Sequence, residues 1–322
     1  MLALYFSGSK AVLQKNYPEP MVRPGEALIR VRLAGIGKTD IEIIQGYMGF
    51  AGVLGREFVG DVIRCNSKPE LVGKRVVGEI NCGCGHCKRC RVGMPEHCPN
   101  RTVMGMLQRD GAFAELLTLP AQNLHVVPDA VADTQAVFAE SLAACYEMLA
   151  QRPDLPGKRV IVLGDGKLGL LAAQVLANAG CDVSCIGKHR RKLDVLAKRG
   201  IPVRLESATA PHNTPVVVDC TGSPSGLLLA RRLVEPRGLI ILKTAIASNN
   251  AIQLAPLIID EVTLMGSRSG PFAPALRALE SHSIDVDSLV SGVFPLAEAT
   301  TAIERAQSPR VLKMLLEPPQ AA

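Results

Sequence analysis

The 322-residue chain is long enough for two domains, and its 48% hydrophobic and 20% charged residues are typical of a folded globular protein. Aromatic residues make up only 3%, and the net charge of +6 is not gathered in one basic tract, which argues against a nucleic-acid partner. No apolar run reaches the roughly 18 residues that span a bilayer, and the first residues do not resemble a signal peptide. We therefore expect a soluble cytoplasmic protein that binds no membrane.

The first part of the chain predicts a β-rich domain of short strands that are broken by glycine and proline. Runs rich in apolar residues favour strands at residues 2–6, 27–35, 57–64, 74–80 and 113–119. From Asp133 to Gln151 the apolar residues recur at helical intervals, and a segment rich in proline and glycine follows. These patterns predict one domain over residues 1–142.

The next part alternates between strands and helices. Short apolar runs predict strands at 159–164, 182–187, 215–222, 238–244 and 261–267, and helical patterns lie between them at 167–180, 190–200, 225–234 and 254–260. Such alternation predicts a doubly wound α/β domain with a parallel sheet over residues 143–266. Residues 267–322 contain two helical patterns and a last strand at 310–318, and we expect this segment to return to the first domain.

Four cysteines in one short loop have the spacing CxxCxxCx7C and predict a zinc site. They are Cys84, Cys87, Cys90 and Cys98. Four thiolates complete a tetrahedral ion and leave no position for substrate, so the predicted site is structural. The alternatives are a chance cluster of thiols or two disulfides, and both are disfavoured because the other cysteines lie scattered in apolar segments. Cys82 and His86 share the loop and are interpreted as bystanders.

The sequence GDGKLG follows the strand at 159–164 and opens a helix, which is the context of a dinucleotide-binding turn. Gly164 permits the tight turn, Gly166 lets the backbone approach a pyrophosphate, and Gly169 allows close packing of the helix, while Lys167 and Leu168 begin that helix. The alternative is a glycine-rich turn that binds no ligand.

The end of the second strand in this domain carries a basic cluster. In NAD-binding proteins an acidic residue there accepts a hydrogen bond from the ribose 2′-hydroxyl, but here Gly187 is followed by Lys188, His189, Arg190 and Arg191. Basic side chains bind a 2′-phosphate, so the cluster favours NADP(H). The alternative is that this charge run is only the solvated first turn of a helix.

Together, these motifs resemble the medium-chain dehydrogenase/reductase family, the zinc-containing relatives of alcohol dehydrogenase. The likeness spans the chain through GEALIRVRLAGI, LGREFVGDV, the four-cysteine loop, AESLAACYEML, GDGKLG and VDCTGS. It implies a GroES-like catalytic domain with a structural-zinc lobe at residues 82–98, a Rossmann domain, and a homodimer or homotetramer formed through the Rossmann sheets. It also implies that Lys313 reaches the cofactor pyrophosphate, and the alternative is that this lysine of the last strand is solvated.

Two ligands of the family's catalytic zinc are missing from this chain. The family cysteine after the AGI segment is Gly37 here, and the histidine of the Gly-His-Glu motif is Arg56. Glu57 and Glu140 match the two remaining acidic positions. Since glycine has no side chain and arginine stays protonated, these residues do not form a three-ligand zinc site. We predict one structural zinc per subunit and no catalytic zinc.

The resemblance suggests what occupies the vacated space. We expect the Arg56 guanidinium to form an ion pair with Glu57 or Glu140, with Lys38 as a second cation nearby. The alternative is that Arg56 turns out to solvent. Thr39 matches the family residue whose hydroxyl relays the substrate proton.

Loss of the metal removes the Lewis acid that stabilises an alkoxide, whereas hydride transfer belongs to the cofactor. The leading interpretation is therefore an NADPH-dependent oxidoreductase that reduces an activated C=C, C=N or carbonyl group of a small molecule. In this interpretation the catalytic residues are Thr39 and Arg56, which polarise the substrate, with Glu57, Glu140 and Lys38 as supporting groups. One alternative is an alcohol dehydrogenase with an unusual active site. The other is a pseudoenzyme or scaffold that binds the cofactor without turnover.

Overall fold

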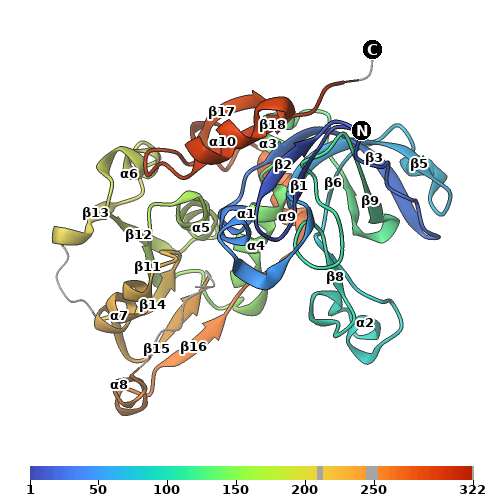
Figure 1. Ribbon diagram of the computed structural model, residues 1–322. Coiled ribbons are helices and arrows are strands. Elements are labelled where there is room, and N and C mark those ends of the chain that lie inside the picture. The colour runs from blue at the N-terminus through green and yellow to red at the C-terminus, as the bar shows by residue number, and fades with distance from the viewer. Residues whose placement is uncertain (209–212, 244–252, 321–322) are drawn as a thin grey trace. The chain divides into compact units, whose positions relative to one another are not determined.

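A computed structural model describes residues 1–208, 213–243 and 253–320 as two compact units (Figure 1). The first unit contains Met1–Glu140, Leu279–Ser281 and Leu289–Ala322, and the second contains Ser141–Ala278 and His282–Ser288. The predicted return of the chain at residue 267 is wrong for Ser267–Ala278, because this segment packs within the second unit. No helix in the described ranges is long and apolar enough to cross a bilayer.

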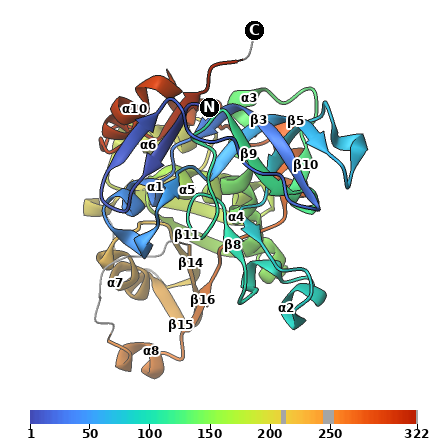
Figure 2. The ribbon, with the colours of Figure 1, turned by 45° about the vertical axis from the view of Figure 1, so that its right-hand side comes forward.

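The first unit is built on mostly antiparallel strands from both ends of the chain, with β17 and β18 paired in parallel (Figure 2). The largest sheet has the order β10 (Leu124–Val126), β6 (Arg75–Gly78), β5 (Glu57–Cys65), β3 (Glu26–Gly35), β18 (Lys313–Glu317) and β17 (Val290–Pro295), and β9 (Leu116–Pro120) also pairs with β3. A smaller sheet has the order β2 (Ala11–Gln14), β1 (Ala3–Phe6) and β4 (Gly52–Val53). The antiparallel pairing of β18 with β3 confirms that the last predicted strand returns to the first unit.

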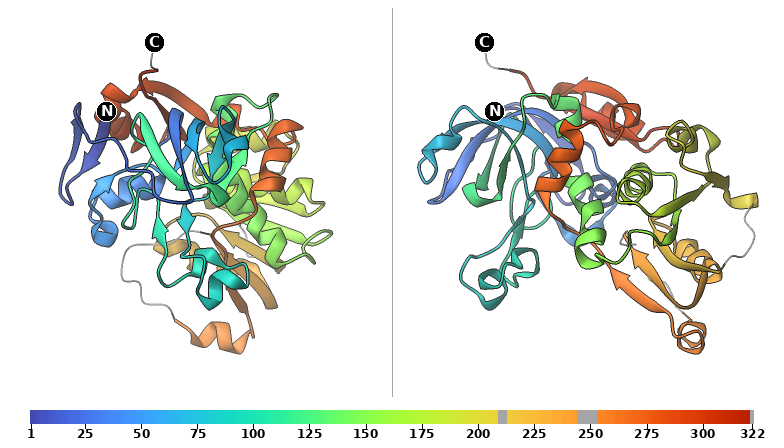
Figure 3. Two further views of the ribbon diagram at one scale, coloured as in Figure 1. Left: turned by 90° about the vertical axis from the view of Figure 1, so that its right-hand side faces the viewer. Right: turned by 180° about the vertical axis from the view of Figure 1, so that it is seen from behind.

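A short lobe extends from these sheets and carries the cysteine loop (Figure 3). It lies between β7 (Asn81–Cys82) and β8 (Thr102–Val103), which pair with each other, and contains the short helix α2 (Lys88–Arg91). Besides α2, the regular structure between these strands is limited to the 3-10 turn Pro95–His97, so side-chain contacts help to fix the shape of the lobe.

The predicted helix over 133–151 is two helices in the structure, α3 (Asp133–Ala136) and α4 (Ala139–Gln151). The chain tightens between them, since the N–H of Phe138 bonds to the carbonyl of Gln135, three residues back. The side chain of Phe138 is fully buried at this break. The sequence pattern did not indicate the break because apolar spacing continues through it.

The second unit is a six-stranded parallel sheet with helices between its strands (Figure 1). The strand order is β13 (Val203–Leu205), β12 (Asp182–Gly187), β11 (Arg159–Leu163), β14 (Thr214–Asp219), β15 (Val234–Leu242) and β16 (Thr263–Gly266). The connecting helices are α5 (Lys167–Asn178), α6 (Arg190–Ala197), α7 (Pro224–Leu233) and α8 (Ala255–Ile259). This is the doubly wound order whose ligands bind at the carboxyl ends of the strands, where the strand order reverses between β11 and β14.

The cores explain why these segments become strands. Ile161, Val217 and Ile240 on neighbouring strands of the second unit are each at most 5% exposed and belong to one apolar cluster. A parallel sheet with helices on its faces buries its central strands, and therefore their sequences are nearly all apolar. Two further helices are α9 (Phe272–Glu280) and α10 (Ala299–Ala306).

Candidate functional site

The four loop cysteines converge in the lobe of the first unit. Their Sγ atoms all lie within 4.8 Å of one another, and those of Cys87 and Cys98 are 3.7 Å apart. A tetrahedral zinc with Zn–S bonds of about 2.3 Å holds sulfur atoms at about 3.8 Å from each other. The four residues therefore fit a structural zinc ion.

The two bystanders of the loop have other partners. The Sγ of Cys82 contacts the carbonyl of Ile80, and burial raises the pKa of the Cys82 thiol to about 11. The Nδ1 atom of His86 lies 2.8 Å from the carbonyl oxygen of Cys84. Neither belongs to the group of four, which agrees with the prediction.

Three charged side chains surround Gly37 at the start of α1 (Lys38–Ile44). A Cβ atom at Gly37 would lie 3.1 Å from Asp40 Oδ2, 3.3 Å from Arg56 Nη2 and 3.3 Å from Glu57 Oε1. A guanidinium thus lies where the family has a cysteine and a histidine around a metal. These residues do not fit the usual donor set of a catalytic zinc.

Arg56 forms its ion pair with Asp40, a residue that the sequence analysis missed. The Arg56 Nε and Asp40 Oδ1 atoms are 3.7 Å apart, and neither has a hydrogen-bond partner among the described residues. The Arg56 side chain is only 13% exposed, so it does not turn out to solvent. The predicted partners Glu57 and Glu140 also act on the charge of Arg56, and the carboxylate of Glu57 forms an ion pair with Lys313.

The environment shifts the pKa values of both members of this pair. Burial raises the pKa of Asp40 above its ordinary value, although the positive charge of Arg56 and the N–H of Gly37 act against this. The negative charges of Asp40 and then Glu140 raise the pKa of Arg56 and outweigh its desolvation. A signal for Asp40 existed in the sequence, because an acid three residues after the N-cap is typical of a helix start. Its carboxylate Oδ2 accepts the N–H of Gly37 at 2.7 Å.

Lys313 lies in a different place from the one predicted. Its side chain is fully buried on β18, and its ammonium group donates a hydrogen bond to Glu57 Oε2. Gly35 makes room for it, since a Cβ there would lie 2.5 Å from Lys313 Cε and 2.6 Å from its Nζ. The prediction that Lys313 is a pyrophosphate ligand is therefore wrong for this structure, because burial and the ion pair hold its ammonium group inside the first unit.

The other predicted catalytic residues lie on nearby elements of the first unit. Thr39 is half-buried in the first turn of α1, and Glu140 is half-buried in the first turn of α4. Lys38 is exposed on α1, with its Nζ 3.7 Å from Glu42 Oε1. The negative charge of Glu140 raises the pKa of Arg56, which places Glu140 near the charged cluster of Asp40, Arg56 and Glu57.

The GDGKLG turn of the second unit has the geometry of a dinucleotide-binding turn. Gly164 adopts a φ of +110°, and a Cβ at Gly169 would lie 2.0 Å from the Gly164 carbonyl oxygen, so neither position accepts a side chain. A Cβ at Gly166 would meet nothing within 4 Å, which leaves open space in front of the first turn of α5. Lys167 and Leu168 begin this helix. The turn and the helix N-terminus therefore fit a dinucleotide pyrophosphate.

A carboxylate does lie at the end of β12, because the side chain of Asp165 extends there from the GDGKLG turn. Asp165 Oδ2 accepts the backbone N–H of Lys188 at 2.7 Å and also that of His189. The His189 Nδ1 atom lies 3.0 Å from the same oxygen. Asp165 was not predicted for this place because it precedes Lys188 by 23 positions in the chain, whereas the acid of an NAD site is expected directly after the strand.

The basic side chains after β12 have acidic neighbours. Lys188 Nζ lies 3.7 Å from Glu206 Oε2, and Arg190 Nε lies 2.9 Å from Asp194 Oδ1. Arg191 is exposed one residue later in α6. All these side chains remain largely accessible, and their charge is partly balanced within the second unit.

The two units and these sites define an oxidoreductase of the nicotinamide-dependent class. Residues 23–129 match the alcohol dehydrogenase GroES-like domain. The chain is similar to sorbitol dehydrogenase of Halalkalibacterium halodurans, with 28% identity over 97% of the chain and 96% of that protein.

Two solved structures show the same fold. A putative zinc-binding dehydrogenase of Sinorhizobium meliloti bound to NADP has a TM-score of 0.89 and 24% identity, and the match covers 98% of this chain and 99% of that one. A protein of Escherichia coli CFT073 described as a short chain alcohol dehydrogenase, complexed with NADH, has a TM-score of 0.88 and 24% identity, with the same coverage of 98% and 99%. Over nearly its whole length the chain is thus similar to dehydrogenases of the kind that the medium-chain dehydrogenase/reductase family comprises.

Proposed function

We propose that this protein is an NADPH-dependent oxidoreductase that carries one structural zinc per subunit, has no catalytic zinc, and reduces an activated C=C, C=N or carbonyl group. The observation that carries this proposal is the Arg56 guanidinium, whose Nη2 atom would lie 3.3 Å from a Cβ at Gly37. A permanent cation in this space disfavours a divalent metal by charge repulsion. It also offers a replacement for the electrostatic role of the metal.

In this proposal each residue of the charged cluster, and Thr39 beside it, has a separate role. Bound NADPH supplies the hydride. Arg56 stabilises the negative charge that develops on a substrate oxygen, because its cation is fixed in a poorly solvated environment. Thr39 donates a hydrogen bond to the same group. Asp40 holds the guanidinium in place, while Lys313 neutralises Glu57 so that this acid does not repel the developing charge.

Metal content combined with a substrate panel tests the proposal. We expect one zinc per subunit by elemental analysis and NADPH-dependent turnover of an enone, an imine, a quinone or an aldehyde. Arg56→Gln should lower kcat/KM about 100-fold, the usual effect of removing a group that stabilises transition-state charge. Arg64→Gln is the matched control, since Arg64 is exposed further along β5. Two zinc ions per subunit contradict the proposal, and tight NADPH binding without turnover indicates a pseudoenzyme.

A second candidate function is oxidation of a secondary alcohol, which the likeness to a sorbitol dehydrogenase favours. The double substitution Gly37→Cys with Arg56→His restores the family's missing ligands. If the double variant binds a second zinc and oxidises polyols while the parent chain does neither, the two substitutions account for the lost activity. Polyol oxidation by the parent chain supports the second candidate instead.

The preference for NADPH rests on the accessible cations after β12. Lys188 and Arg190 have exposed side chains that are able to move from their acidic neighbours to a 2′-phosphate. We expect NADPH to bind more tightly than NADH, and the combined substitution Lys188→Gln with Arg190→Gln to narrow the difference. Equal affinities in the parent chain contradict the preference.

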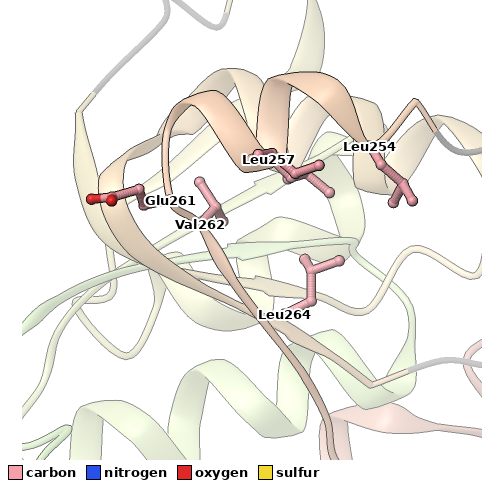
Figure 4. Close-up of a pocket in the computed structure, with 6 residues that line it drawn as sticks. Leu254, Leu257, Glu261, Val262 and Leu264 are labelled. Atoms are coloured by element: carbon pink, nitrogen blue, oxygen red, sulfur yellow. The ribbon is translucent and has the colours of Figure 1, made fainter.

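We propose a second copy of the chain as the macromolecular partner, joined through the second unit. Within the described residues β16 is an edge strand, paired only with β15, so one row of its backbone groups is unpaired. The adjoining surface is apolar, with Ile258 72% and Leu264 38% exposed. Figure 4 shows the hollow between α8 and β16 that Leu257, Val262 and Leu264 help to line. A two-fold axis at this edge would pair β16 with its own copy.

A further inference from the structure

The carboxylate of Asp165 lies at the end of β12, although the residue belongs to the preceding βα turn. Its Oδ2 atom accepts two consecutive backbone N–H groups, those of Lys188 and His189, and lies 3.0 Å from the His189 ring nitrogen Nδ1. The Asp165 side chain is 11% exposed. A carboxylate this buried is stable only when such donors compensate its charge, so the contact is part of the folded structure of the turn.

Gly187 explains why the acid comes from position 165. A Cβ at Gly187 would lie 2.6 Å from Asp165 Cβ, 2.9 Å from its Cγ and 2.8 Å from its Oδ2. These distances are too short for any side chain. The side chain of Asp165 therefore excludes an acidic residue at position 187. The site still has a negative charge at the end of β12, because Asp165 supplies it.

Asp165 and the basic side chains favour different dinucleotides. A ribose 2′-hydroxyl can donate a hydrogen bond to a carboxylate, whereas a 2′-phosphate is repelled by one and needs donors. The N–H groups of Lys188 and His189 are such donors, and Asp165 occupies both of them. Lys188, Arg190 and Arg191 offer charge to the phosphate from the same segment.

We propose that Asp165 is a specificity-determining residue of the dinucleotide site, whose carboxylate limits the preference for NADPH by taking the backbone donors and accepting the 2′-hydroxyl of NADH. This inference rests on the proposed dinucleotide site. The protein then uses both dinucleotides, and NADPH has only a modest advantage from the cations.

Binding titrations on the whole chain test this role. Asp165→Asn removes the charge and keeps the shape, and we expect the ratio of NADPH to NADH affinity to rise about tenfold, the effect of about one charge-assisted hydrogen bond. Asp182→Asn is the matched control because Asp182 is exposed at the opposite end of β12 and carries the same charge. We expect this control to stay within about twofold of the parent chain. An unchanged or lower ratio in Asp165→Asn overturns the proposal.

A measurement without cofactor separates this inference from the proposed function. Asp165→Asn should reduce the hydrogen-exchange protection of the Lys188 and His189 amides, since a neutral amide is a weaker acceptor than a carboxylate. If the parent chain binds neither dinucleotide, the proposed function and the specificity role fail together, while the exchange result still tests the contact. Asp165→Ser removes the charge and keeps a small acceptor. A higher ratio of NADPH to NADH affinity in both variants supports the role, and an unchanged or lower ratio in either variant overturns it.

Discussion

Two substitutions change the chemistry of one small volume in the first unit. Gly37 removes a thiolate, and Arg56 introduces a cation where a neutral ligand is usual in the family. Within the volume Arg56 and Lys313 face the acids Asp40 and Glu57, and the charge of Glu140 also acts on Arg56. Two monovalent cations thus supply the charge of one divalent ion, which keeps the buried carboxylates compensated.

The pH dependence of stability should report the environment of Asp40. Burial raises its pKa in the folded protein above the ordinary value of 3.8. A group with a raised folded pKa contributes stability that is complete below the unfolded pKa and is lost as the pH rises through the folded pKa. We expect the free energy of unfolding of the parent chain, minus that of Asp40→Asn, to fall as the pH rises from the ordinary pKa of the unfolded state to the raised pKa of the folded state, by about 1.4 kcal/mol for each pKa unit between the two values.

Urea unfolding of both proteins at several pH values gives this difference. The other titrating groups are common to the two chains, so their contributions cancel to first order. A difference that grows with pH would mean that the charge of Arg56 outweighs burial and that the pKa of Asp40 is lowered.

The effects of substitutions at Lys313 and Gly35 on the free energy of unfolding should not be additive, because the Lys313 side chain packs against Gly35. Lys313→Met leaves Glu57 as an uncompensated buried acid, and we expect a loss of about 3–5 kcal/mol in unfolding free energy. Gly35→Ala forces the Lys313 side chain to move and should cost about 1–3 kcal/mol. In the Lys313→Ala background the same Gly35→Ala change should cost much less, since the clash is gone. Equal costs in both backgrounds, measured by denaturant unfolding, contradict the packing inferred from the 2.5 Å approach.

At the scale of elements, local sequence patterns predicted strands and turns well, but they did not predict which distant residues contact each other. The strands 159–164 and 182–187 and the GDGKLG turn were predictable because apolar periods and glycine positions are properties of neighbouring residues. The contact of Asp165 with Lys188 joins residues 23 positions apart, and that of Glu57 with Lys313 joins residues 256 positions apart. Sequence spacing carries no record of such contacts, so both were missed.

The four-cysteine lobe should depend on its metal more than the sheets do. We expect Cys90→Ser to lower zinc content and to expose the segment between β7 and β8 to limited proteolysis, because the lobe has little regular structure without the ion. Cys65→Ser is the control, since Cys65 is buried at the end of β5, away from the loop. Cleavage at unchanged sites and rates after zinc removal contradicts a structural role for the metal.

At the scale of the whole molecule, each unit holds a separate part of the proposed chemistry. The first unit contains the charged cluster and the four cysteines, and the second contains the dinucleotide turn and the edge strand β16. The turn and the edge strand belong to one parallel sheet, whose central strands are buried. Changes at the exposed edge should therefore leave the dinucleotide turn intact.

Self-association through β16 is testable with single charges at this edge. Leu264→Lys places a cation beside its own copy in a two-fold interface, so that like charges meet and the apolar contact is lost. We expect sedimentation velocity to show a shift from a dimer or tetramer toward smaller species. NADPH affinity should change by less than about twofold, because Leu264 lies on the edge strand and the turn follows the central strand β11.

Met21→Lys provides the matched control, since Met21 is 84% exposed in the first unit and receives the same charge. If both variants keep the oligomeric state of the parent chain, the edge of β16 is not the interface. If Met21→Lys alone dissociates the assembly, the partner copy binds the first unit. Only dissociation by Leu264→Lys, with the control unchanged, agrees with pairing at the sheet edge, because that outcome alone requires a contact at the strand that carries the charge.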